Sequence, residues 1–249
     1  MNHIYWDVDK ISMLTDRMNA ANHSHGMIQF FLCPEDKLNI KVSNKSIEAR
    51  AVFVNANIMH SFKTDGKICF TSVIEPASSI GISLSQLMNE NDYYALKDEK
   101  IKEINENVIN MVDDFTKEPY FKLMESLSKG LGLKGTEVIL DDRVLELLGM
   151  LEHCTCHDHS IDTYADKLCI SSSRLSHIFV EEIGIPLKKY LILHQLERAF
   201  SLILQGSRIT DAALEAGFDT PSHFASTVKR LMGLPARNTI KDSGFLKVY

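Results

Sequence analysis

The last third of the chain contains the same short pattern twice. Residues 165–186 comprise a short helical run, a tight turn and a longer amphipathic run that ends at a Gly-x-Pro segment, and residues 213–235 repeat this order. In each longer run the apolar residues stand three and four positions apart, which is the period of one helix face. A short helix, a turn and a second helix form a helix-turn-helix, whose second helix can enter the major groove of DNA. The repeat therefore predicts two such units and favours double-stranded DNA as the partner.

The residues at the start of each second helix support this interpretation. In the first unit Ser171 or Ser172 can cap the helix, because a serine oxygen accepts a hydrogen bond from an unpaired backbone N–H. In the second unit Gly217 supplies the turn and Thr220 is the expected cap. Pro221 fits the first helical position, where its missing N–H costs nothing.

The segment between the two units predicts one long amphipathic helix over residues 186–205, ended by Gly206. With this connection the region from about Ser160 to Ile240 resembles the DNA-binding region of the AraC/XylS transcription regulators, in which a long helix joins two helix-turn-helix units. The most specific matches are Leu196-Glu197-Arg198-Ala199, Ile209-Thr210-Asp211-Ala212-Ala213, Gly217-Phe218, Ser222-His223-Phe224, Lys229-Arg230 and Gly233. The resemblance implies a sequence-specific DNA-binding regulator.

The resemblance also implies which side chains face DNA, because this family reads bases with the second helix of each unit. The residues at these places are Ser172, Ser173, Arg174, Ser176 and His177 in the first unit, and Pro221, Ser222, His223, Ser226, Lys229 and Arg230 in the second. Most of them are small, so DNA shape and water-bridged contacts should contribute more than usual to specificity. Phosphate contacts are expected from Arg174, Lys188, Lys189, Lys229, Arg230 and Arg237. The alternative is that these charges form an ordinary solvated helix surface.

Charge is distributed unevenly along the chain. The net charge is +2 from Ser160 to Tyr249, against −8 from Met1 to His159 and −6 in total. A weakly basic module attached to an acidic part suits a specific regulator, because low non-specific affinity keeps it from being titrated by bulk DNA. A histone-like protein that coats DNA is excluded by the same balance.

The first part of the chain reads as short strands. Apolar or alternating runs at residues 27–32, 38–42, 49–54 and 68–74 are separated by polar turn segments. Closely spaced antiparallel strands of this kind make a small barrel or jelly roll, which can enclose a ligand. The expected fold class is therefore α+β, with an N-terminal antiparallel β-barrel, following helices, and an all-α C-terminal part with two helix-turn-helix units.

This strand region resembles the cupin-like sensor half of many regulators of the same family. His23, His25, Gln29 and later His60 follow the order of the ligands in metal-binding cupins, with the glutamine at a place where a glutamate is common. Two histidines at i and i+2 of a strand point the same way, so His23 and His25 could share one metal ion. The alternative is that these side chains only line the pocket or bond the barrel rim. The candidate ligand-binding residues are His23, His25, Gln29, Phe30, Phe53, Met59 and His60.

The cysteines raise a second question about metals. Residues 153–159, directly before the first helix-turn-helix, contain two cysteines and three histidines, which could hold zinc or copper(I), or which could form a polar loop. Five cysteines, an odd number without a secreted framework, indicate reduced thiols. Cys169, in the turn of the first unit, is expected to be buried.

The middle of the chain is predicted to be helical. Apolar residues recur at three- and four-residue steps from Ile101 to Phe115, and a second stripe spans residues 144–151. Either stripe could be core against the barrel, and the first one could instead form a dimer contact, as such helices often do in the family. The predicted division is a sensor domain at residues 1–83, a helical linker or dimerisation region at 84–157 and a DNA-binding domain at 158–249.

These features favour a ligand-responsive transcription regulator and not an enzyme. Its partners would be double-stranded DNA, a small-molecule effector in the barrel, a second copy of the chain, and RNA polymerase if it activates. No cofactor is expected, although a divalent metal ion at His23, His25, Gln29 and His60 stays open. The N-terminus lacks a signal-peptide core and no run is long enough to span a membrane, so a cytoplasmic protein is expected. The alternatives are a metal-dependent cupin enzyme or metal sensor using those four residues, and a dimeric scaffold.

Overall fold

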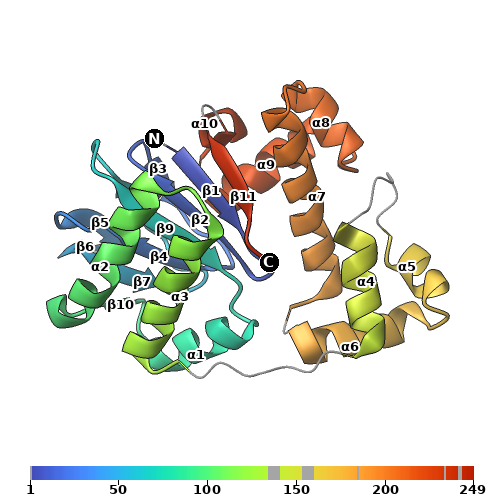
Figure 1. The fold of residues 1–249 in the computed structure, drawn as a ribbon, viewed down its shortest axis with the longest axis horizontal. Coiled ribbons are helices and arrows are strands. Elements are labelled where there is room, and N and C mark those ends of the chain that lie inside the picture. Colours follow the sequence, from blue (N-terminus) through green and yellow to red (C-terminus); the bar gives the residue numbers. More distant parts are fainter. Residues whose placement is uncertain (1, 134–140, 153–159, 184, 233, 241–242) are drawn as a thin grey trace. The chain divides into compact units, whose positions relative to one another are not determined.

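Two β-sheets and the helices packed on them form the first of two compact units in a computed structural model (Figure 1). The structure describes residues 2–133, 141–152, 160–183, 185–232, 234–240 and 243–249. The first unit comprises residues 1–76, 80–135 and 227–249, and the second comprises residues 77–79 and 136–226. The predicted division at residues 83 and 157 stays a prediction.

The larger sheet has seven strands in the order β10-β7-β4-β9-β2-β1-β11. These strands are β1 (Asn2–Trp6), β2 (Lys10–Thr15), β4 (Ile28–Leu32), β7 (Ala51–Val54), β9 (Cys69–Ile74), β10 (Tyr93–Ala95) and β11 (Gly244–Lys247). Neighbours are antiparallel except for β1 and β11, which are parallel. The smaller sheet has the order β3-β8-β5-β6, with β3 (Asn19–His23), β5 (Leu38–Val42), β6 (Lys45–Ala49) and β8 (His60–Lys63).

The strands predicted at residues 27–32, 38–42 and 68–74 are confirmed within one residue as β4, β5 and β9. The run at residues 49–54 is not one strand, because β6 ends at Ala49 and β7 begins at Ala51. The chain crosses from the smaller to the larger sheet at Arg50, which is where the run must bend.

One face of the larger sheet packs against α1 (Ser79–Met88), α2 (Asp98–Asp113) and α3 (Lys117–Leu131) (Figure 1). Phe30 and Phe53, on neighbouring strands, stack there with ring centroids 4.3 Å apart. The apolar stripe of α2, which includes Ile101 and Val108, is buried in the same core. Of the two roles predicted for this stripe, the structure therefore shows core packing.

The other face of the larger sheet meets the smaller sheet. Because side chains alternate along a strand, Gln29 and Phe31 of β4 lie opposite to Phe30. Phe31 stacks on Phe62 of β8, with ring centroids 4.2 Å apart. The space between the two sheets is therefore the interior of the predicted barrel.

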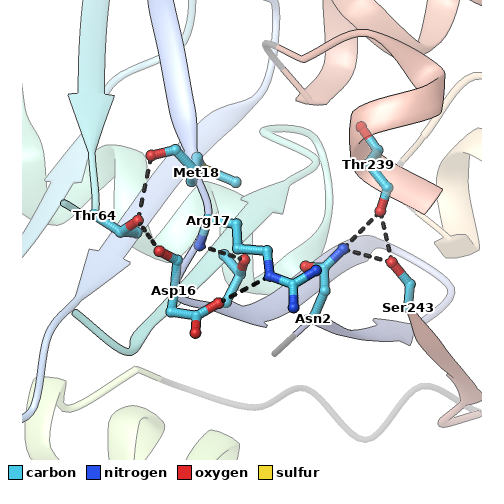
Figure 2. A network of polar contacts seen from close by, with 8 residues as sticks. Asn2, Asp16, Arg17, Met18, Thr64, Thr239 and Ser243 are labelled. Carbon is cyan, nitrogen blue, oxygen red and sulfur yellow. Dashed lines mark hydrogen bonds and ion pairs between the residues drawn. The ribbon is translucent and has the colours of Figure 1, made fainter. Parts of the chain in front are cut away.

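The C-terminal strand closes the edge of the larger sheet, with Ile4 opposite Phe245. Figure 2 shows how the preceding segment is held: the Asn2 amide donates to the Thr239 carbonyl over 2.7 Å and contacts the Ser243 hydroxyl at 2.5 Å. A Cβ at Gly244 would lie 2.6 Å from the Phe115 ring, so only glycine lets the strand approach this closely.

The C-terminal helices follow the predicted order of two short-long pairs joined by one long helix. They are α4 (Asp142–Glu152), α5 (Ile161–Lys167), α6 (Ser172–Ile183), α7 (Leu187–Leu204), α8 (Ile209–Glu215), α9 (Pro221–Met232) and α10 (Ala236–Ile240). Among the described residues, none of the helices combines the length and the apolar character that crossing a membrane requires.

The two turns share one hydrogen-bond geometry. The amide after Cys169 donates to the Ala165 carbonyl over 3.1 Å, and the amide after Gly217 donates to the Ala213 carbonyl over 3.0 Å. Both turn residues have a positive φ, 54° at Cys169 and 94° at Gly217, which is the left-handed ending typical of a helix C-terminus. The sequence repeat is thus a repeat of backbone structure.

Cys169 itself contradicts the expectation that it is buried, because its side chain is exposed. The residue that reverses the chain just beyond a helix end lies at the surface, whatever its polarity. Its left-handed conformation is one that glycine adopts without steric cost and that other residues adopt at a cost of about 1–2 kcal/mol.

The two turns give a paired prediction. Cys169→Gly should raise the free energy of unfolding by about 0.5–1 kcal/mol, because the relieved strain exceeds the extra freedom of glycine in the unfolded chain. Gly217→Ala should lower it by about 1 kcal/mol for the opposite reason. Urea unfolding followed by circular dichroism measures both changes. Cys169→Ala is the control, and equal stability of the alanine and glycine variants at Cys169 would contradict the assigned strain.

The C-terminal strand gives a second prediction through Trp6, the single tryptophan of the chain. Trp6 is buried on β1, and its ring lies 6.0 Å from that of Phe245. Deletion of residues 244–249 should shift its fluorescence to longer wavelength. It should also cost about 2–3 kcal/mol of stability through the lost burial of Val248. Tyr249→Ala, which alters an exposed side chain of the same segment, should leave the emission in place. Unchanged emission after the deletion would show that β11 does not cover Trp6.

Candidate nucleic-acid interface and histidine cluster

Both second helices begin with the same type of cap. The Arg174 amide donates to the Ser171 hydroxyl over 3.2 Å, and the His223 amide donates to the Thr220 hydroxyl over 3.1 Å. Each oxygen satisfies the third amide of its helix, which has no partner within the helix. Of the two serines that could cap α6, the structure uses Ser171. Pro221 is the first residue of α9, as predicted.

Each second helix buries one face. On α6 the buried residues Leu175, Ile178 and Phe179 stand three and four positions apart. On α9 Phe224 is buried, and its ring lies 5.4 Å from Phe218 and 6.3 Å from Phe200. This packing fixes which side chains of the two helices remain outside.

The opposite faces carry most of the predicted DNA-contacting residues. The exposed ones are Ser173, Arg174 and His177 on α6, and Ser222, His223, Ser226, Lys229 and Arg230 on α9. Ser172, Ser176 and Pro221 are half-buried. Each helix therefore presents a polar surface with one or two basic residues, as an approach to DNA requires.

Several hydroxyls of these helices already use their hydrogen. Ser176 donates to the Ser172 carbonyl over 2.8 Å, and Ser226 donates to the His223 carbonyl over 2.9 Å. Ser172 bonds the Asp162 carboxylate of α5. These groups can still accept a hydrogen bond, but they cannot also offer their proton to a base. Apart from the basic side chains, the exposed imidazoles of His177 and His223 are therefore the largest of the predicted DNA-contacting groups on these surfaces.

His223 is the more constrained of the two imidazoles. Its Nδ1 lies 3.7 Å from a carboxylate oxygen of Asp219, which precedes the helix, and its ring packs edge-on against Phe218 with centroids 5.4 Å apart. These two contacts orient the ring. Among the residues expected to contact phosphates, Lys188 and Arg237 are exposed and Lys189 is half-buried.

The candidate ligand residues of the N-terminal unit fall into separate groups. Phe30 and Phe53 lie on the helix-covered face of the sheet, and Met59 is exposed. His23, His25, Gln29 and His60 lie together between the two sheets, where a cavity of about 10 Å³ adjoins His23 and Gln29. The cavity also contacts Phe31, Thr71 and Val73, which were not predicted. Period-two alternation from Gln29 would have identified Phe31.

The histidines lie close together, but not because two of them share a strand, as predicted. His23 ends β3 and pairs with His60, the first residue of β8, next to a register shift that begins at Ala20. His25 lies beyond the strand, in the loop that leads to β4, so it does not share a strand with His23. The ligand atoms of the three imidazoles nevertheless lie within 4.8 Å of one another.

Burial keeps the imidazoles of His25 and His60 uncharged. Loss of solvent and, to a smaller extent, the neighbouring His23 lower the pKa of His25 to about 4. Loss of solvent likewise lowers the pKa of His60 to about 3. Both side chains are therefore neutral at neutral pH, with a ring nitrogen lone pair available. The other predicted cluster, at residues 153–159, lies outside the described residues.

Comparison with known proteins supports the assignment of the C-terminal region. Residues 164–242 match the family described as a helix-turn-helix domain. An uncharacterised HTH-type transcriptional regulator of Staphylococcus aureus is 30% identical over 95 residues, which are 38% of this chain and 13% of that protein. The arabinose operon regulatory protein of Escherichia coli strain K12 is 29% identical over 97 residues, which are 38% of this chain and 33% of that protein. The chain therefore matches a third or less of the length of these relatives.

The fold of the whole chain has a counterpart among solved structures. The apo form of a ToxT variant from Vibrio cholerae strain SCE256 covers 93% of this chain and 97% of its own, with a TM-score of 0.50 at 14% sequence identity. This likeness concerns the fold alone, and it confirms the expected order of a β-sheet region followed by helix-turn-helix units. Together with the sequence matches, the repeated turns and caps show that this region contains two helix-turn-helix units.

Proposed function

We propose that the protein is a sequence-specific DNA-binding transcription regulator. The observation that carries the proposal is the repeat of one turn geometry and one cap geometry in two helix-turn-helix units, each of which exposes a polar second helix. The relatives support it, because both are named as regulators. A regulator acts where the DNA is, so the cytoplasm is the proposed location.

Readout by this interface would combine few direct base contacts with many phosphate contacts. The serine hydroxyls of Ser176 and Ser226 bond their own helices, which leaves His177 and His223 as the main side chains for base edges. Arg174, Lys229 and Arg230 would neutralise phosphates and position the helices. Specificity would then depend strongly on DNA shape and bound water.

The N-terminal unit is the proposed sensor, and its polar groups between the sheets are the proposed control site. The cavity beside them has a volume of about 10 Å³, which is the room that one water molecule needs. Organic ligands occupy sites of about 300–1,000 Å³, so an organic effector at this cavity would require the barrel to open. A very small effector fits without such a change.

We also propose that the active form is a homodimer. The buried stripe of α2 is committed to the core, but Ile109 of α2 and Phe121 of α3 are 49% and 46% exposed. Large apolar side chains at the surface of one helical hairpin favour an interaction with another apolar surface. A second copy of the chain would supply it and would double the contacts with DNA.

The DNA-binding proposal predicts different effects for different residues of the two helices. Selection from a random duplex library at near-physiological salt should enrich a bipartite site, with its two elements about one helical turn apart. His177→Ala should reduce the preference for that site about tenfold, through the loss of a base contact. Lys229→Ala should weaken binding to all DNA sequences alike. It should also lower the number of counterions released on binding by about one, which reduces the salt dependence of the affinity.

Titrations of labelled duplexes at several salt concentrations measure both effects. Lys45→Ala is the matched control, because it removes an exposed lysine from β6 of the other unit, away from the proposed dimer contact. The assigned roles would be contradicted if His177→Ala and Lys229→Ala each lost the same affinity for selected and for random DNA. Failure of the library to enrich any site would overturn the proposed function.

The proposed dimer predicts that a substitution at the contact halves the molecular mass in solution. Sedimentation should give a dimer for the natural chain at micromolar concentration and a monomer for Phe121→Glu, because a charge at the contact must be desolvated. Leu145→Glu, which alters an exposed leucine of α4, should leave the dimer intact. A monomeric natural chain, or a Phe121→Glu variant that stays dimeric, would contradict this contact.

A further inference from the structure

The His23, His25 and His60 side chains meet between two sheets with their ligand nitrogens directed at one another. Their ring centroids are separated by 4.5 Å between His23 and His60, 5.1 Å between His25 and His60, and 5.4 Å between His23 and His25. His60 is 1% exposed, and His23 is half-buried and borders the small cavity. Three imidazoles from two segments of the chain, residues 23–25 and His60, thus share one partly enclosed site.

Backbone carbonyls fix the orientation of each ring. The Nδ1 atoms lie 2.8 Å from the Ala21 carbonyl for His23, 3.1 Å from the Met27 carbonyl for His25, and 2.8 Å from the Ile58 carbonyl for His60. A carbonyl can only accept, so a proton on each Nδ1 satisfies all three contacts and leaves each Nε2 with a lone pair. A ring held by one nitrogen while the other stays unprotonated is the usual support of a metal-binding histidine.

Two of these Nε2 atoms are buried without a hydrogen-bond partner. The Nε2 atoms of His23 and His60 are inaccessible to solvent and no group within the described residues bonds them. A buried acceptor left unsatisfied costs about 1–3 kcal/mol, so a purely structural role would leave both costs uncompensated. An electron-pair acceptor between the rings would satisfy both nitrogens at once.

Gln29 supplies a fourth group with a defined orientation. Its amide nitrogen donates to the Thr71 hydroxyl at 2.5 Å and to the Ser72 carbonyl at 3.2 Å. Because the nitrogen end must face these groups, the amide oxygen faces His25, where it lies 3.2 Å from Nε2. In the absence of an ion, His25 can donate from Nε2 to this oxygen and accept from the Met27 amide at 3.3 Å instead. A cation would replace the proton on His25 Nε2, and both this nitrogen and the Gln29 amide oxygen would become its ligands.

We propose that His23, His25 and His60 bind one divalent late first-row transition-metal ion through their Nε2 atoms, with the Gln29 amide oxygen as the fourth ligand. Three imidazoles favour zinc, cobalt or nickel over magnesium and calcium, which prefer oxygen ligands. Tetrahedral zinc with bonds of about 2.0–2.1 Å holds its ligand atoms about 3.3 Å apart. The nitrogens, now within 4.8 Å, would move closer on binding, and the half-buried His23 at the strand end is the ligand with room to do so.

The test is a titration of the full-length protein with cobalt(II), followed by visible absorption. The expected result is one tightly bound ion per chain with the d–d bands of a four-coordinate nitrogen and oxygen site, and its displacement by one equivalent of zinc. His60→Ala and His23→Ala should each weaken cobalt binding at least about 100-fold, because each removes a ligand and not merely a supporting group. Circular dichroism shows whether each variant folds, and His23→Ala serves if loss of the buried His60 prevents folding.

Two controls keep the result specific to this site. His3→Ala removes a histidine of the same unit that is not in the cluster, and it should leave cobalt affinity unchanged. A Cys154→Ser, Cys156→Ser double variant should also bind normally, since thiolate ligation would give an intense near-ultraviolet band that this site lacks. The proposal is overturned by the absence of stoichiometric binding, or by binding that survives both histidine substitutions. The measurement involves no DNA, so its outcome is independent of the proposed regulatory function.

Discussion

Strand β4 is buried on both faces, and the two halves of the N-terminal unit depend on this property. One face sends Ile28, Phe30 and Leu32 into the core beneath the helices. The other sends Gln29 and Phe31 between the sheets, where they meet the histidines and Phe62. Because side chains alternate strictly along a strand, a shift of one residue would place the amide in the apolar core and a phenyl ring at the cluster. The register of one strand thus holds the core and the candidate site together.

The C-terminal strand follows α9 and α10 in the chain, so it joins this sheet to the second helix of the second helix-turn-helix unit. Within the first unit, β11 follows α10 and the end of α9, and it pairs with β1 along its whole length. Asn2 secures the same segment through Thr239 and Ser243 (Figure 2). A change in the sheet could therefore affect DNA binding only to the extent that two arrangements of the chain differ in free energy. That difference in free energy bounds any control of DNA binding by the N-terminal unit.

Local patterns in the sequence were sufficient to predict the two helix-turn-helix units, but they were insufficient to predict the sheets of the N-terminal unit. The cap at Thr220, the turn at Gly217 and the buried stripe of α6 each depend on residues within one or two turns, so they could be predicted. The pairing of β11 with β1 joins segments about 240 residues apart, and its four-residue strand has no local periodicity that would reveal it. Cys169 was misjudged because its side chain suggests burial, whereas the left-handed turn requires exposure. The histidines named from the sequence do lie together, but next to a register shift in β3 that the sequence does not reveal, and their binding role stays a prediction.

A metal ion at the histidine cluster would connect the two sheets. His23 and His60 belong to the smaller sheet, whereas Gln29 belongs to β4 of the larger one. In the larger sheet β4 is connected to β11 through the neighbouring strands β9, β2 and β1, and β11 follows α9 and α10 in the chain. Contraction of the ligand nitrogens around an ion would draw β3 and β8 towards β4 at one end of this series. Such a closure would affect DNA binding only if the ion bound two arrangements of the chain with different affinities, because equal affinity for both shifts no equilibrium.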